Sequence, residues 1–203
     1  MKRRRHSSAA RSRRSNLRRN GLRRLFAALV LIAVLTIFLL HRDGVRDFLV
    51  DDTRFSEEIV RAARTNGLDP ALVRAVVFQE SRFNPSARGT KGEIGLMQIL
   101  PDGAAEEWAR TYRRPRPTDA ELRDPELNLA IGCWYLARAM RRWQDRRCQI
   151  ELALCQYNAG ARRAERWQPD TPDGTVIDRI TIASTRLYVE RIMARYRKYK
   201  EES

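Results

Sequence analysis

Apolar residues recur at helical spacing along most of the chain after residue 55, and this periodicity limits the folds that the chain can adopt. The longest such stripe has members at i, i+4, i+7, i+11 and i+14: Leu129, Cys133, Leu136, Met140 and Trp143. No stretch alternates apolar and polar residues as a half-buried strand does, and no segment repeats. The sequence therefore predicts an all-α domain over residues 55–203.

Capping and turn residues divide this region into separate helices. The first helix begins near Ser56 and ends at Gly67, and the last runs from about Ile182 to Tyr199. Between them we predict a helix from Pro70, a short helix capped by Asp102, a capping box at Thr118 and Glu121, the longest helix of the domain from Pro125, and helices over residues 150–158 and 161–167.

The helix that begins at Pro70 ends its apolar stripe in an acid. Asp69 suits the N-cap and Pro70 the first helical position. Val73, Val77 and Glu80 fall at i, i+4 and i+7, so Glu80 lies in line with the face that must be buried. Because burial penalises the charged form, we expect a raised pKa for Glu80, as a general acid near neutral pH requires. The alternative is that Glu80 reaches solvent at the helix end and has no function.

A glycine-rich loop follows this helix. Asn84-Pro85 disfavours further helix, and Gly89, Gly92 and Gly95 permit tight turns and close approach to a ligand or a neighbouring helix. Three segments then follow one another, Glu-Ser-x-Phe-Asn-Pro, Gly-x-x-Gly-Leu-Met-Gln-Ile and Tyr-Asn-Ala-Gly, beginning at residues 80, 92 and 157. In this order and spacing they resemble the catalytic domain of the soluble lytic transglycosylase family, relatives of goose-type lysozyme.

The resemblance covers about residues 55–198 and implies an α-rich, lysozyme-like fold and a peptidoglycan substrate. In that family one glutamate protonates the glycosidic oxygen between MurNAc and GlcNAc, and the N-acetyl carbonyl of the sugar assists. The same glutamate then takes the proton of the sugar's own 6-hydroxyl, so a 1,6-anhydromuramoyl end forms without water. Carried over by position, Glu80 is this acid and base, and no cofactor is expected.

The resemblance also implies which residues bind the substrate. Those that match the family motifs are Ser81, Met97, Gln98, Tyr157, Asn158 and Tyr188. Ser81 is expected to position the helix end, and the tyrosines and the asparagine to supply hydrogen bonds near Glu80. The alternative for each is structural, as a turn hydroxyl, a core Leu-Met pair or a buried tyrosine.

Two positions depart from the family pattern. Many members have a serine that binds the N-acetyl group nine residues after the glutamate, where this chain has Gly89, and Thr90 offers a hydroxyl instead. The residue before Thr185 is often glutamate and is Ser184 here. Glycoside hydrolases normally use two carboxylates, and the nearest second acid is Glu93, which we interpret as a loop surface residue.

The N-terminal region predicts a basic tail and a membrane anchor. Residues 1–24 are rich in arginine without any acid, which is typical of a disordered tail. Residues 25–40 are apolar except for Thr36 and would span about 24 Å as a helix. No small-x-small cleavage signal follows, so we predict an uncleaved single-pass anchor and a connector over residues 43–54. The positive-inside rule places the N-terminus in the cytoplasm and the domain in the periplasm of a bacterial cell.

The net charge of +15 belongs mainly to the tail. Residues 1–42 hold 12 of the 40 Lys and Arg residues and no acid, which leaves 28 bases against 25 acids. A mildly basic domain gives little reason to expect nucleic acid as a partner, whereas it tolerates an anionic cell wall. The expected partners are therefore peptidoglycan glycan strands and the membrane, with protein partners in an envelope complex left open.

The three cysteines and two histidines have no metal-binding spacing, so no metal site is expected. Cys148 and Cys155 would lie about 10 Å apart on one helix, too far for a disulfide, while pairs with Cys133 stay open. We favour small buried hydrophobic side chains for all three.

Three functions compete on this basis. The first is a membrane-anchored lytic transglycosylase, the second a peptidoglycan hydrolase of the goose-type lysozyme kind, and the third a non-catalytic peptidoglycan-binding protein of the envelope. Because no convincing second acid is present, the sequence favours the transglycosylase. It leaves open whether cleavage is endo or exo.

Overall fold

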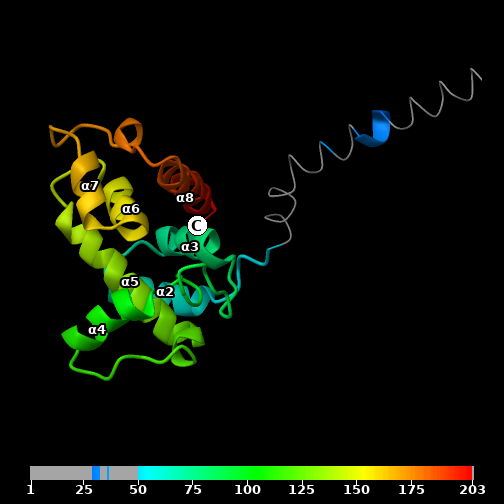
Figure 1. Ribbon diagram of the computed structural model, residues 1–203, viewed down its shortest axis with the longest axis vertical. Helices are drawn as coiled ribbons and strands as arrows, with labels where there is room; N and C mark the ends of the chain where they lie inside the picture. The colour runs from blue at the N-terminus through cyan, green and yellow to red at the C-terminus, as the bar shows by residue number, and fades with distance from the viewer. Residues whose placement is uncertain (1–28, 33–35, 37–49, 203) are drawn as a thin grey trace, which may run out of the picture. The chain divides into compact units, whose positions relative to one another are not determined.

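The computed structural model describes residues 29–32, 36 and 50–202 (Figure 1). The chain divides into two compact units, Met1–Val50 and Asp51–Ser203, which are described separately. In the first unit, residues 29–32 and 36 are helical and exposed. The tail, most of the predicted anchor and the connector up to residue 49 lie outside the described residues. Within the described ranges, no helix combines the length and the apolar character needed to cross a membrane.

Helices make up the second unit, so the prediction of an all-α domain is confirmed (Figure 1). The α-helices are α2 (Ser56–Thr65), α3 (Pro70–Ser81), α4 (Glu106–Thr111), α5 (Pro125–Arg142), α6 (Gln149–Ala159), α7 (Ala161–Trp167) and α8 (Ala183–Glu201). Shorter turns of helix are η1 (Pro101–Ala105), η2 (Glu121–Arg123) and η3 (Ile177–Arg179). In residues 50–202 the β-structure consists of two isolated bridges, Arg88 to Ile94 and Ile94 to Ile99.

Helix α3 is buried along most of its length, from Ala71 to Phe78 with the exception of Arg74. The predicted N-cap is present, because Asp69 Oδ1 accepts a hydrogen bond of 2.9 Å from Ala71 N. The helix ends at Ser81, where the next two residues adopt positive φ angles of 50° and 61°. This reversal turns the chain into the glycine-rich loop.

Helices α3 and α8 form the most extensive helix contact of the described domain and lie side by side in Figure 1. Helix α8 has 19 residues and α5 has 18, so the prediction that α5 would be the longest is wrong. The reason lies at the C-terminal end of α8. Tyr199 is fully buried there and donates a hydrogen bond of 2.8 Å to Asp52 Oδ2, which extends the helix to Glu201.

The remaining caps agree with the sequence except at one position. The capping box at Thr118 and Glu121 and the N-cap at Asp124 are both present. The predicted cap at Asp102 is wrong, because residues 101–105 form the wide, kinked turn η1 and α4 begins only at residue 106. The Asp102 carboxylate instead forms an ion pair with Arg116.

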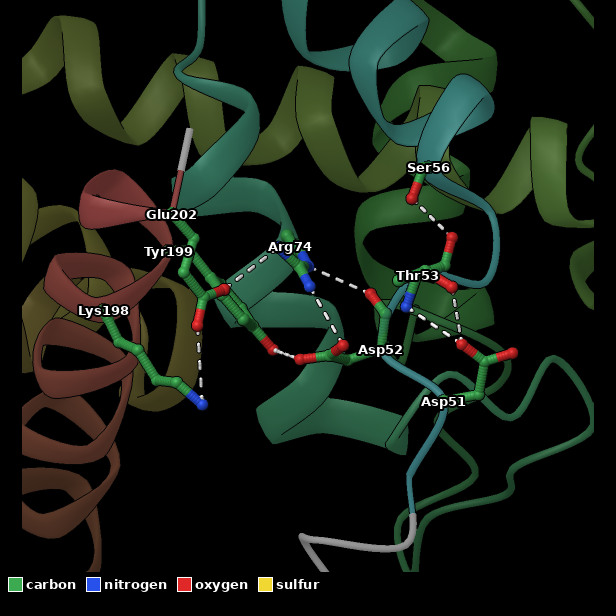
Figure 2. A network of polar contacts seen from close by, with 8 residues as sticks. All are labelled: Asp51, Asp52, Thr53, Ser56, Arg74, Lys198, Tyr199 and Glu202. Carbon is green, nitrogen blue, oxygen red and sulfur yellow. Dashed lines mark hydrogen bonds and ion pairs between the residues drawn. The ribbon is translucent and has the colours of Figure 1, made fainter.

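A polar network fastens the first residues of this unit to α3 and α8 (Figure 2). Arg74 Nη2 lies 2.9 Å from Asp52 Oδ1, and Arg74 Nε donates to Asp52 O at 2.9 Å. The guanidinium also lies 3.8 Å from the centre of the Tyr199 ring and 3.8 Å from Glu202 Oε2. The start and the end of the domain are therefore held together through one arginine.

The cysteines are buried and unpaired in the described structure. Cys133 lies in α5, Cys155 in α6, and Cys148 directly before α6. Burial raises the pKa of Cys133 and of Cys155 to about 12, so both thiols stay protonated. The prediction that they serve as small hydrophobic side chains is confirmed.

Candidate active site

Glu80 lies in the last turn of α3, half-buried, and faces α8. Tyr188 on α8 donates a hydrogen bond of 2.6 Å to Glu80 Oε1. Burial is the main reason that the pKa of Glu80 is raised from 4.5 to about 7; the bond from Tyr188 opposes this rise, and the nearby charge of Glu93 adds to it. Near neutral pH the group is divided between acid and carboxylate, so it can both donate and accept a proton.

A second tyrosine connects α6 with the glycine-rich loop. Tyr157 donates a hydrogen bond of 2.8 Å to Met97 O. Burial raises the pKa of Tyr157 and of Tyr188 well above 10, and the charge of Glu80 raises both further. Both hydroxyls therefore remain neutral hydrogen-bond donors at the pH where Glu80 titrates.

The loop between α3 and η1 folds back onto the end of α3. Ser81 Oγ donates to Leu96 O at 2.8 Å, and Ile94 and Ile99 exchange backbone hydrogen bonds of 3.0 and 2.9 Å. Gly95 has a φ of 82°, and a Cβ there would lie 2.2 Å from Asn128 Nδ2. Only glycine fits at this position, which lets the loop pack closely against Asn128 of α5.

Asn128 on α5 is a positioning residue that sequence analysis missed. Its side chain is fully buried, Oδ1 accepts a hydrogen bond of 2.8 Å from Met97 N, and Nδ2 donates to Ile94 O at 2.9 Å and to Leu122 O at 2.7 Å. A buried amide with its polar atoms bonded in this way specifies one arrangement of the loop. The available signal was a polar residue between two leucines on a core helix.

Met97 and Gln98, the two predicted substrate contacts in the segment that begins at Gly92, have different surroundings. The Met97 side chain is fully buried and packs against Gly132, so direct contact between that side chain and a ligand does not fit this structure. Gln98 is half-buried and has an unusual φ of 49°. Its Nε2 donates to Ala87 O at 3.3 Å and to Gly95 O at 2.9 Å.

Asn158 links the two helices that carry the tyrosines. It is exposed at the end of α6, and its Oδ1 accepts a hydrogen bond of 2.8 Å from Thr185 Oγ1 on α8. Thr185 is itself buried, so the bond is sheltered on one side. Its position in the fold supports a role in holding Tyr157 and Tyr188 in a common arrangement.

The expected substitution of Thr90 for a serine finds no support in the geometry. Thr90 is exposed on the loop. The space beside Gly89 is instead filled by Glu93, whose Oε2 would lie 2.3 Å from a Cβ at residue 89. Glu93 is half-buried rather than a plain surface residue, which sequence analysis missed. The feature of the sequence that could have indicated this is Gly89, because a glycine leaves room beside it for another side chain.

The titratable groups of this site are carboxyls and phenols. In residues 29–32, 36 and 50–202, no three His, Cys, Asp or Glu side chains are grouped so that they could hold a metal ion. A partly desolvated carboxyl that accepts a hydrogen bond from a neutral tyrosine suits proton transfer to and from a bound substrate. The arrangement therefore defines a class: a helical domain that presents a partly desolvated carboxyl at the end of a buried helix.

Sequence comparison gives the family. The Transglycosylase SLT domain matches residues 57–176, more than half of the chain. This protein belongs to the SLT transglycosylase family.

Individual relatives agree with this assignment. The soluble lytic murein transglycosylase of Salmonella typhimurium is 28% identical over 145 residues, which cover 69% of this chain and 22% of that protein. The membrane-bound lytic murein transglycosylase F of Desulfosudis oleivorans is 37% identical over 110 residues, 53% of this chain and 22% of that protein. The crystal structure of lytic transglycosylase Slt from Pseudomonas aeruginosa, an inactive glutamate-to-glutamine mutant, matches with a TM-score of 0.65 and 29% identity over 74% of this chain and 24% of that one. This chain thus corresponds to less than a quarter of each of these relatives.

Proposed function

We propose that this chain is a membrane-anchored lytic transglycosylase, which cleaves the β-1,4 bond between MurNAc and GlcNAc in peptidoglycan without water. The observation that carries the proposal is the Glu80 carboxyl, half-buried, bonded to the neutral Tyr188 hydroxyl and with a pKa of about 7. Membership of the SLT family and relatives named lytic murein transglycosylases support the same substrate.

In the first step, protonated Glu80 donates its proton to the glycosidic oxygen. The bond between that oxygen and C1 of MurNAc breaks, and the carbonyl oxygen of the MurNAc acetamido group bonds to C1 in its place. The hydrogen bond from Tyr188 occupies Oε1 of Glu80, so Oε2 is the atom that carries the proton. A pKa of about 7 keeps a large fraction of the acid protonated at neutral pH.

In the second step, the Glu80 carboxylate accepts the proton of the C6 hydroxyl of the same MurNAc. The hydroxyl oxygen attacks C1 and displaces the acetamido oxygen, so a 1,6-anhydro ring closes and the acetamido group is restored. Glu80 ends the cycle protonated, as it began. One carboxyl is enough for both steps because the substrate supplies both nucleophiles.

Mass spectrometry of digested sacculi tests this proposal. The full chain should release 1,6-anhydroMurNAc ends, and Glu80→Gln, which keeps the shape but carries no transferable proton, should release none. Reducing ends would identify a hydrolase of the goose-type lysozyme kind. Binding without cleavage would identify a non-catalytic peptidoglycan-binding protein.

We further propose that residues 25–40 anchor the protein in the bacterial inner membrane, with the N-terminus in the cytoplasm and the catalytic domain in the periplasm. Supporting observations are the helical, exposed apolar side chains at residues 29–32 and the relatives named membrane-bound. Alkaline carbonate should leave the chain in the membrane, and protease added to spheroplasts should remove the domain. Release by carbonate, or protection of the domain, would contradict the anchor.

A further inference from the structure

Two side-chain oxygens converge on the space beside Gly89. A Cβ at residue 89 would lie 2.3 Å from Glu93 Oε2 and 2.9 Å from Gln98 Oε1. Any larger residue at this position would therefore displace one oxygen or both. The glycine therefore makes room for a pair of acceptor oxygens.

Existing hydrogen bonds fix which atoms form this pair. Because Gln98 Nε2 donates to two backbone carbonyls, Oε1 is the atom that faces Gly89. Glu93 Oε2 accepts from Lys91 N at 2.8 Å, and Gly89 N donates to Glu93 O at 2.8 Å, so the turn that carries the carboxylate is closed. Within the described part of the chain, the hydrogen bonds of the Gln98 side chain all run through Nε2, so its Oε1 has an open acceptor site.

The pair belongs to the same site as Glu80. The segment that carries Gln98 is held to α3 by the bond from Ser81 to Leu96 O, and to α6 by the bond from Tyr157. The charge of Glu93 acts on the Glu80 carboxyl, and such an effect requires that the two groups be near each other. The acceptor pair and Glu80 are therefore close enough to act on the same ligand.

Two acceptors without a donor between them favour a ligand group that donates. A sugar hydroxyl and an amide N–H can both do so, but the hydroxyl also carries lone pairs, whereas the amide N–H only donates. Each sugar of the proposed substrate carries one such N–H, in its acetamido group. We propose that Glu93 and Gln98 Oε1 bind the N–H of the substrate's acetamido group, an inference that rests on the proposed function.

This contact would favour the reacting state over the bound substrate. When the acetamido oxygen bonds to C1, the group becomes positively charged and its N–H becomes a stronger donor. A carboxylate then stabilises it more than it stabilises the neutral amide of the substrate. The contact also turns the acetamido carbonyl toward C1, as the first step requires.

A binding experiment tests the contact without turnover. In the Glu80→Gln background, calorimetry compares a tetramer of N-acetylglucosamine with cellotetraose, which has no acetamido groups. We expect the full chain to prefer the first ligand by about tenfold or more, and Glu93→Ala to remove most of that preference, because a hydrogen bond to a charged group is worth about that much. An unchanged preference in Glu80→Gln/Glu93→Ala would overturn the inference.

Kinetics separate this contact from a structural role of Glu93. Glu93→Gln keeps the shape and an acceptor for Lys91 N, so kcat should fall about tenfold with little change in KM. The alkaline limb of the pH profile should move to lower pH, because the Glu93 charge raises the pKa of Glu80 while the other facing groups, Tyr157 and Tyr188, stay neutral. Lowered stability with an unchanged kcat and pH limb would show that Glu93 only closes the turn, and the inference would fail.

A matched charge removal controls for general electrostatics. Glu126 is exposed and pairs with Arg61 between α5 and α2, away from the Glu80 contacts. Glu126→Gln should change neither kcat nor the pH limb. An equal shift in both variants would mean that Glu93 acts only through the overall charge, against the inference.

The room at Gly89 provides a second, steric test. Gly89→Ser alone should lower activity about tenfold, because its Cβ meets Glu93 Oε2. Gly89→Ser/Glu93→Ala removes that clash and supplies a hydroxyl oxygen, so it should recover several-fold over Gly89→Ser. If the activity losses of Gly89→Ser and Glu93→Ala simply added in the double variant, the two residues would not share a contact, and this would count against the inference.

The two proposals fail in different ways. Loss of the acetamido preference in Glu93→Ala together with reducing ends from the unmodified chain would refute the transglycosylase reaction and leave the contact standing. Release of 1,6-anhydro ends by the unmodified chain, together with an unchanged acetamido preference in Glu93→Ala, would support the transglycosylase reaction and refute the contact.

Discussion

The acids at the two ends of α3 are both contacted by tyrosine hydroxyls of α8, but their neighbours differ. At the start of the helix, Tyr196 donates to Asp69 Oδ2 at 2.8 Å, and Lys200 Nζ lies 3.0 Å from the same oxygen. At its end, Tyr188 donates to Glu80 at 2.6 Å, and the charged group that acts on the carboxyl is another acid. One helix pair therefore holds two carboxyls in opposite electrostatic surroundings.

The pKa values follow this difference. Burial alone would raise the pKa of Asp69, but the hydrogen bonds from Tyr196, Lys200 and Ala71 N outweigh it and lower the pKa. Burial of Glu80, with the charge of Glu93 added, raises its pKa to about 7 against the bond from Tyr188. Where a cation lies beside the tyrosine, as at Asp69, the carboxyl stays ionised and links α3 to α8. Where a second acid lies nearby instead, as at Glu80, the carboxyl is partly protonated near neutral pH and can donate its proton.

The largest expected effect is on activity. Glu80→Gln should lower the rate of glycan cleavage by about 10³-fold or more, because it removes both the acid and the base. Asp69→Asn, a matched change at the other end of α3, should keep most of the activity per folded molecule. Cleavage rates on purified sacculi in detergent measure both. Comparable losses in the two variants would mean that the ends do not differ in function.

The next effect is on stability at the start of α3. Arg74→Met leaves the Asp52 carboxylate without its cation and removes the contact with the Tyr199 ring, so the free energy of unfolding should fall by about 3 kcal/mol. Urea unfolding in detergent at neutral pH measures it. The cleavage rate of the folded fraction should stay near that of the unmodified chain. A stable but inactive Arg74→Met would place this network in the chemistry instead.

A smaller stability effect of opposite sign is expected at Glu80. Its raised pKa means that the folded chain binds the proton more tightly than the unfolded chain, so the free energy of unfolding falls as pH rises from about 4.5 to about 7 and stays lowered above that. Glu80→Gln should therefore raise the free energy of unfolding by about 2 kcal/mol near pH 8 and leave it unchanged near pH 4.

Asp69→Asn provides the contrast for this pH dependence. The pKa of Asp69 is lowered, so its ionised form stabilises the fold above the ordinary aspartate range, and this stabilisation is lost as pH falls through the folded pKa. The variant should be less stable near pH 8 and approach the unmodified chain in acid. If both variants changed stability in the same direction near pH 8, the difference between the two ends of α3 would be refuted.

The same contrast explains what the sequence could predict. Asp69, Pro70 and the spacing of Val73, Val77 and Glu80 act within one helix, so both the cap and the buried acid follow from local rules. The all-α class follows from periodicity in the same way. These features need no knowledge of other elements.

Contacts between segments that are distant in the chain could not be predicted from the sequence. Asn128 bonds to a loop some 30 residues earlier, and the burial of Met97 depends on Gly132 of another helix. Asp102 finds Arg116 rather than a helix end. The partner of each side chain is set by packing between elements, which periodicity does not specify. Gly89 and Glu93 share a loop, but their contact depends on how that loop folds.

The smallest effect compares two tyrosines of α8. Tyr188→Phe removes the hydrogen bond that lowers the pKa of Glu80, so the alkaline limb of the pH profile should move to higher pH. The cleavage rate near pH 6 should nevertheless fall about tenfold, because the carboxyl loses the donor that orients Oε2 toward the substrate. Tyr196→Phe removes the equivalent bond at Asp69 and should leave both the rate and the limb unchanged. Glycan cleavage rates measured across pH for Tyr188→Phe and Tyr196→Phe test this prediction. If Tyr188→Phe moved the limb to lower pH, the carboxyl would have to be held by another donor, and the role of α8 at this end of α3 would be packing alone.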